Sequence, residues 1–154
     1  METNYKEPNV LLSVLQLLTF IAAYIIIYFI LGLIFFTIAN FISGIPFLKY
    51  FLRAFPVHET ISYTLLPILS AALIYEANSF IYKKYYFNLI STALFFMFLS
   101  WLMVDHIIDT AANYGVFTWS FANWLWSDAL LVVIIFVMFF KRTKFGEEKV
   151  KSNG

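Results

Sequence analysis

The stretch VLLSVLQLLTFIAAYIIIYFILGLIFFTIA, residues 10–39, contains no charged side chain and decides the class of fold. The uncharged region around it is longer still, because no charged residue occurs between Glu7 and Lys49. A helix needs about 20 apolar residues to cross the hydrocarbon core of a bilayer. Residues 10–39 are therefore predicted to form a membrane-spanning helix that is tilted or extends into the interface.

Three further apolar stretches predict three further spanning helices, at residues 60–81, 87–108 and 119–140. A helix satisfies its own backbone hydrogen bonds, as the bilayer core requires. These stretches are too long for strands and lack the alternation of apolar and polar residues that strands show. The sequence therefore predicts one domain of the all-α integral membrane class, a four-helix transmembrane bundle.

The composition of the whole chain agrees with a membrane protein and excludes several other classes. Hydrophobic residues make up 62% of the chain and charged residues only 12%, far from the averages of soluble domains. The formal net charge of +1, without a basic stripe, argues against a nucleic-acid partner, so membrane lipids are the expected surroundings. Because the chain has no cysteine, disulfides and thiolate metal sites are excluded.

Two segments outside the spans have a recognisable character. In residues 41–56, Lys49 and Arg53 lie four positions apart on one helical face, and phenylalanines repeat at the same spacing on another. This pattern predicts a short amphipathic helix at about 46–56, lying in the membrane interface between the first two spans. Residues 141–154 are charged and predict a flexible C-terminal tail.

The distribution of basic residues predicts the orientation. Eight of the ten lysines and arginines fall on one side of the predicted topology, namely Lys6, Lys83, Lys84, Lys141, Arg142, Lys144, Lys149 and Lys151. Only Lys49 and Arg53 fall on the other side. The positive-inside rule then places both termini in the cytoplasm, and we expect the cytoplasmic membrane of a prokaryote.

Ionisable residues gather at the outer end of the third predicted span, where Asp105, His106 and Asp109 follow one another. Counted from the hairpin at 83–84, His58 lies within about 5 Å of the depth of His106, which predicts that the two imidazoles approach each other. Imidazole and carboxylate groups together suit a metal ion, with His58, His106, Asp105 and Asp109 as candidate ligands. A haem b held by the two histidines is a weaker alternative, and hydrogen bonding without any ligand is a third.

Asp128 stands inside the fourth predicted span, about 20 Å from its inner end. An aspartate at the centre of a spanning helix costs about 2.5–3.5 kcal/mol on the insertion scale. We therefore predict that Asp128 faces protein and has a polar partner. If the site is catalytic, Asp128 would be one carboxylate of a pair, with Asp109 or Asp105 as the other.

Asp109, Asn123 and Asp128 give the chain a local resemblance to the lipoprotein signal peptidases. These are four-span proteins of similar length, with a catalytic aspartate on either side of the third outer connection. The resemblance covers residues 104 to about 140 and would imply peptide hydrolysis. The family's asparagine–glycine–alanine segment is absent, Asn123 stands five rather than three residues before Asp128, and the aspartate and lysine of the family's first span are missing. We therefore do not assign the chain to this family.

The first span offers few polar residues, and its small residues Ala22, Ala23 and Gly32 are candidates for close helix packing. The chain has 19 Phe, 10 Tyr and 4 Trp. Such side chains could line a pocket for an isoprenoid, a quinone or a carotenoid, although aromatic residues in membrane proteins more often serve as interface anchors and packing residues.

Three functions remain open on this basis. The favoured expectation is an accessory or structural subunit that binds other integral-membrane subunits and carries an outer-facing His/Asp site. The alternative is an intramembrane enzyme that acts on a lipid, isoprenoid or peptide substrate, using Asp128 with Asp105, His106 and Asp109. A proton or cation transporter that uses Asp128 is the lesser alternative.

Overall fold

The computed structural model describes the backbone of residues 5–45, 57–114 and 119–152. Side chains are described in the same ranges, except at 39, 42–43, 57–63, 114, 119–124 and 149–152. The predicted interfacial helix at 46–56 therefore lies outside the described residues. His58 lies on a described helix, but its side chain is outside the description.

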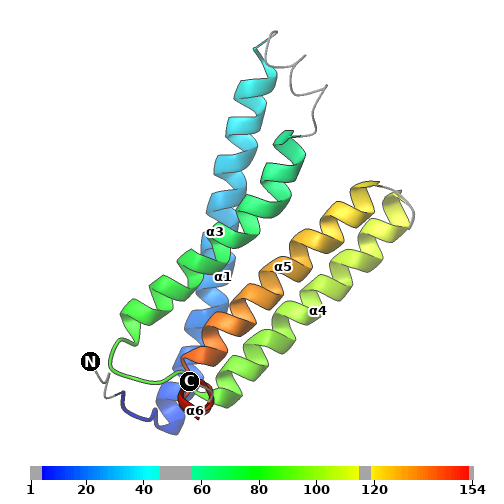
Figure 1. Cartoon of the computed structure of the whole chain (residues 1–154). Coiled ribbons are helices and arrows are strands. Elements are labelled where there is room, and N and C mark those ends of the chain that lie inside the picture. The colour runs from blue at the N-terminus through cyan, green and yellow to red at the C-terminus, as the bar shows by residue number, and fades with distance from the viewer. Residues whose placement is uncertain (1–4, 46–56, 115–118, 153–154) are drawn as a thin grey trace.

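The predicted all-α class is confirmed for the part of the chain that the structure describes (Figure 1). Its helices are α1 (Val10–Ser43), α3 (Val57–Ile81), α4 (Leu89–Tyr114), α5 (Trp119–Lys141) and α6 (Lys144–Ser152). Three of them contain stretches long and apolar enough to cross a membrane, at Val10–Ile38, Thr64–Ile81 and Leu89–Asn113. This finding agrees with a membrane location.

Helix α4 begins two residues later than the sequence predicts, because Asn88 caps it. The Asn88 side-chain oxygen accepts hydrogen bonds from the backbone N–H groups of Ile90 and Ser91, at 2.9 and 3.1 Å. An asparagine in this position satisfies N–H groups that have no partner within the helix. Phe87 is left outside α4, where its N–H donates to the carbonyl of Arg142 at 3.1 Å.

The helices are tied together at one end of the bundle. Residues 5–9, 82–88 and 142–146 meet there, and we call this end the base. Isolated bridges join Lys6 to Tyr85 and Phe87 to Thr143. In Figure 1, α3, α4 and α5 run roughly alongside one another, whereas α1 is more upright and crosses them at an angle, and α5 contacts both α3 and α4.

An aromatic cluster fills the interior just above the base. Phe20 of α1 is fully buried, and its ring lies 5.0 Å from Phe87, 5.6 Å from Phe95 and 4.8 Å from Phe139 between centroids. The contacts with Phe87 and Phe139 are edge-to-face, a favoured geometry for aromatic pairs. This cluster joins α1, α4 and α5 around a single core.

Arg142 closes the C-terminal end of α3. Its guanidinium donates hydrogen bonds to the carbonyls of Ser79 and Tyr82, at 3.3 and 3.2 Å. The last carbonyls of a helix have no partner within the helix, so a basic side chain is well suited to satisfy them. The guanidinium also lies over the rings of Tyr5 and Phe87, 4.8 and 5.1 Å from their centroids.

The C-terminal tail contains helix α6, and its flexibility stays a prediction. The Thr143 side-chain oxygen accepts a hydrogen bond from the N–H of Gly146 at 3.0 Å, which caps the helix. Gly146 fits closely, since a Cβ there would clash with the carbonyl oxygen of Phe140. Lys144 pairs with Glu7 at 2.6 Å, and this hydrogen bond and the negative charge of Glu7 raise the pKa of Lys144.

Gln16 of α1 is fully buried at the base and makes two hydrogen bonds to the backbone. Its side-chain NH₂ donates to the carbonyl of Tyr86 at 2.9 Å, and its side-chain oxygen accepts from the N–H of Asn88 at 2.8 Å. These bonds fix the turn between α3 and α4 against α1. They also leave Asn88 in position to cap α4.

Replacing Gln16 by methionine is expected to lower the free energy of unfolding by about 1–3 kcal/mol for each backbone group that loses its partner. Methionine has a similar length, so the packing changes little while both hydrogen bonds are lost. The measurement is reversible unfolding in mixed detergent micelles, followed by circular dichroism. Leu18→Ala, on the exposed side of the same helix, is the control. If Gln16→Met and Leu18→Ala lowered the free energy of unfolding by the same amount, a structural role for the Gln16 hydrogen bonds would be contradicted.

Candidate functional site

His106 of α4 and Asp128 of α5 form a direct pair. His106 Nδ1 lies 2.7 Å from Asp128 Oδ2. A carboxylate can only accept, so an ionised Asp128 accepts this hydrogen bond from a protonated Nδ1. The Asp128 side chain is 13% exposed and that of His106 is 36% exposed. The carboxylate of Asp128 is therefore mostly buried, and the imidazole of His106 is the more exposed of the two groups.

The prediction that Asp128 faces protein and has a polar partner is confirmed. The enzyme alternative placed Asp128 with Asp105, His106 and Asp109, but it did not single out His106 as the hydrogen-bond partner. The chain runs away from the base along α4 and back toward it along α5. Residues at similar distances from the base on these two antiparallel helices can therefore lie side by side. His106 lies about 26 Å along α4 from Leu89, and Asp128 about 20 Å along α5 from Lys141. Counting from these helix ends places both Asp105 and His106 near the depth of Asp128, so depth alone does not choose between them.

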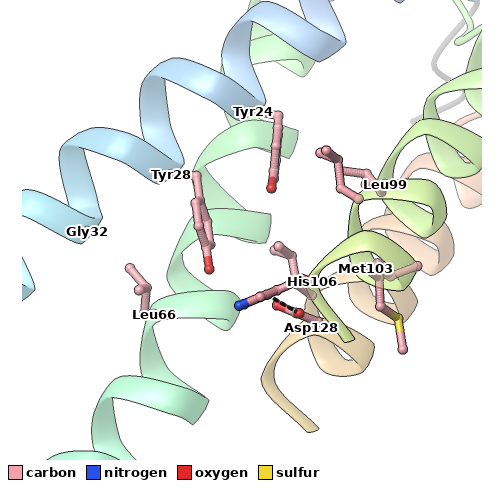
Figure 2. Close-up of a pocket in the computed structure, with 11 residues that line it drawn as sticks. Tyr24, Tyr28, Gly32, Leu66, Leu99, Met103, His106 and Asp128 are labelled. Atoms are coloured by element: carbon pink, nitrogen blue, oxygen red, sulfur yellow. Dashed lines mark hydrogen bonds and ion pairs between the residues drawn. The ribbon is translucent and has the colours of Figure 1, made fainter. Parts of the chain in front are cut away.

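The pair lies in the wall of a cavity of about 320 Å³, which we call the central pocket (Figure 2). Helix α1 contributes Tyr24, Tyr28 and Gly32, and α3 contributes Leu66. Apolar side chains of α4 and α5 complete the lining around His106 and Asp128. The site is thus a mainly apolar chamber with a few polar groups, the usual character of a small-molecule pocket.

Two tyrosines of α1 face the pair across the central pocket. The rings of Tyr24 and Tyr28 are stacked, with centroids 5.5 Å apart and planes 20° apart. In Figure 2 their hydroxyl groups point toward the side of the pocket where His106 and Asp128 lie. The edge of the imidazole that is turned away from Asp128 points toward Tyr28 and Leu66. Sequence reasoning named aromatic residues in general as possible pocket lining but did not single out these two tyrosines, because α1 is apolar around its whole circumference.

Gly32 has a different role from the one predicted for it. The sequence suggested that it allows close helix packing, but a Cβ added at Gly32 would meet nothing within 4 Å. The glycine borders the open volume of the central pocket rather than a neighbouring backbone. A larger side chain at this position would therefore extend into the pocket.

The predicted metal site is only partly covered by the structure. Asp105, His106 and Asp109 are described, and no group of three or more acidic or histidine residues that could hold a metal ion occurs among the described residues. Asp105 and Asp109 are exposed, and the Asp109 side chain accepts a hydrogen bond from Asn113 at 3.1 Å. The approach of His58 to His106, and the metal or haem that it would support, stays a prediction.

The described geometry does not pair Asp128 with a second carboxylate. The hydrogen-bond partner of Asp128 is an imidazole, and Asp109 bonds to the side chain of Asn113 instead. A carboxylate that holds an imidazole fixes its tautomer and orientation, which prepares the second ring nitrogen to accept or donate a proton. This arrangement is chemically able to transfer a proton inside a mainly apolar pocket.

Comparison of the chain with known protein families, with curated proteins and with solved structures finds no match.

Proposed function

We propose that the chain is a four-span membrane protein that performs acid–base chemistry on a lipid-soluble substrate in the central pocket. Helix α5 is the proposed fourth span, since it has 23 residues, is mainly apolar and lies against two of the three candidate spans. The observation that carries the proposal is the His106–Asp128 pair, with its 2.7 Å separation, in the wall of an apolar cavity.

The depth of the pocket supports a substrate that enters from the bilayer. Exposed lysines gather at the base, at positions 6, 83, 84, 141 and 144, which suits a membrane surface. The pair lies about 20–26 Å above the base along its helices, which is inside a hydrocarbon core of about 30 Å. By the positive-inside rule, we propose that the base faces the cytoplasm. An ionisable pair at this depth is costly, and such residues commonly have a function.

The roles of the residues follow from their contacts. His106 is the proposed general acid or base, since its imidazole is the more exposed member of the pair. Asp128 is a positioning residue that holds the imidazole through Nδ1. The tyrosine hydroxyls of α1 are the proposed hydrogen-bond donors to an oxygen of the substrate, where they would stabilise developing negative charge.

A lipid-extract assay tests this proposal. The purified protein is placed in vesicles made from the total lipids of its own source membrane, and the lipid classes are followed over time by mass spectrometry. We expect the wild-type protein to convert at least one lipid-soluble class and His106→Gln to convert none. Glu76→Gln, an exposed carboxylate variant on α3, is the control and should match the wild type. Unchanged lipids with the wild-type protein, or equal conversion by His106→Gln, would contradict the proposal.

A second proposed function, an accessory subunit of a larger membrane complex, is supported by the surface of α1. Only 6% of the apolar stretch by which α1 could span a membrane is buried within the chain. The corresponding stretches of α3 and α4 are 28% and 22% buried. Large side chains such as Phe29, Phe36 and Phe41 are 64–73% exposed on this helix. The helices of a partner protein would cover such a surface in place of lipid. Stoichiometric partners that crosslink to α1 in the native membrane would support this function, and a solitary protein would contradict it.

A further inference from the structure

The size of the central pocket limits what it can hold. A cavity of about 150 Å³ with an apolar lining is large enough to bind benzene. The central pocket, with about 320 Å³, has room for a ring with several substituents but not for a whole long-chain lipid. A lipid bound here would place its head in the pocket and leave its tail between the helices and the bilayer.

The charge of the lining limits the chemistry of that head. The described lining residues include the acidic Asp128 but no lysine or arginine. Phosphate and diphosphate groups are usually held by arginine, lysine or a metal ion, because burying an unpaired anion is costly. A phosphate beside Asp128 would also meet a like charge. The lining therefore favours an uncharged head over an isoprenoid diphosphate or a phospholipid headgroup.

The polar groups of the lining are suited to oxygen atoms. The hydroxyls of Tyr24 and Tyr28 can each donate one hydrogen bond, and the imidazole of His106 can donate or accept according to its protonation. These groups come from α1 and α4, on two sides of the pocket (Figure 2). A carbonyl oxygen on one edge of a ring can therefore face the tyrosines while an oxygen on another edge faces His106.

We infer that the central pocket binds an uncharged ring that carries carbonyl or hydroxyl oxygens and an apolar tail, the chemistry of an isoprenoid quinone. The inference rests on the proposed function, because it names the substrate class of the same site. Oxygens on two edges of one ring match the placement of the tyrosine and histidine groups, and an apolar tail suits the proposed depth of the pocket in the hydrocarbon core.

The test is photolabelling of the purified protein in detergent with an azidoquinone that carries a short isoprenoid tail. Labelled peptides are identified by mass spectrometry. We expect the label on pocket-lining segments of α1, α4 or α5. An unlabelled quinone with the same tail should displace the label, whereas farnesyl diphosphate and dodecylamine at the same concentration should not.

Gly32→Leu is the decisive variant, because Gly32 lines the pocket and a Cβ added there meets nothing within 4 Å. We expect the apparent affinity for the quinone to fall at least about tenfold, while Ala22→Leu, on an exposed position of the same helix, binds as the wild type does. Tyr28→Phe removes one hydroxyl and keeps the ring. A hydrogen bond contributes about 0.5–1.5 kcal/mol, so this variant should bind about 2- to 10-fold more weakly.

Three outcomes would overturn the inference. Displacement of the label by the diphosphate or the amine but not by the quinone would assign the pocket to a charged lipid, and the proposed acid–base function would stand. Unchanged affinity in both Gly32→Leu and Tyr28→Phe would place the quinone outside the pocket. Labelling that misses the pocket altogether would also refute the quinone, and the lipid-extract assay would then decide the proposed function independently.

Discussion

Asp128→Asn is expected to slow conversion of the substrate by about 10²- to 10⁴-fold, the range over which positioned acid–base groups act. Asp128 accepts the hydrogen bond of His106 Nδ1 at 2.7 Å, and in the proposed mechanism the second ring nitrogen acts as the base. An asparagine can present its NH₂ group to Nδ1 instead. That contact favours the opposite tautomer, in which the second nitrogen already carries a proton and cannot accept one.

The effect of Asp128→Asn should appear in kcat rather than in KM, because Asp128 acts through His106 and not on the substrate. The fold should be retained or slightly stabilised, since an amide is cheaper than a carboxylate at this depth of a membrane. The measurements are the conversion rate at several substrate concentrations and thermal unfolding of the same samples. Glu76→Gln is the matched control, because it also replaces a carboxylate by an amide. A wild-type kcat in Asp128→Asn would show that the pair is structural.

Phe20→Ala is expected to reduce the free energy of unfolding by about 3–5 kcal/mol. Phe20 is fully buried and contacts the rings of Phe87, Phe95 and Phe139, so truncation leaves a cavity among three helices. Within a bilayer, lipid tails are as apolar as the side chain, and helices associate through close packing rather than the hydrophobic effect. The loss of these contacts is therefore the main destabilising term.

The measurement is unfolding of the purified variant by increasing dodecyl sulfate in mixed micelles, followed by circular dichroism. Phe36→Ala is the control, because this residue lies on the same helix and is 67% exposed. Surface replacements of this kind usually change stability by less than about 0.5 kcal/mol. Phe20→Leu should recover part of the loss, since it fills part of the cavity. Equal destabilisation by Phe20→Ala and Phe36→Ala would show that the aromatic cluster does not stabilise the fold.

Much of the architecture could be predicted because it depends on local properties of the chain. Long runs of apolar residues form helices in lipid whatever their neighbours are, so the predicted segments at 10–39, 60–81 and 119–140 lie within α1, α3 and α5. The start of α4 was predicted two residues too early. The cap is a local contact that this prediction overlooked, since the Asn88 side-chain oxygen accepts from Ile90 and Ser91, and Gln16, far away in the chain, adds a hydrogen bond to the Asn88 N–H.

The sequence by itself determined that the chain is helical, suited to a membrane, and that Asp128 must turn toward protein, because an isolated carboxylate in hydrocarbon is too costly. The tertiary structure alone decided that His106 is its partner and that Tyr24, Tyr28 and Gly32 complete the pocket. The physical reason concerns the rotation of each helix about its own axis. A helix that is apolar on every side carries no signal for the face that it presents to its neighbours, so packing against α3 and α4 selects that face.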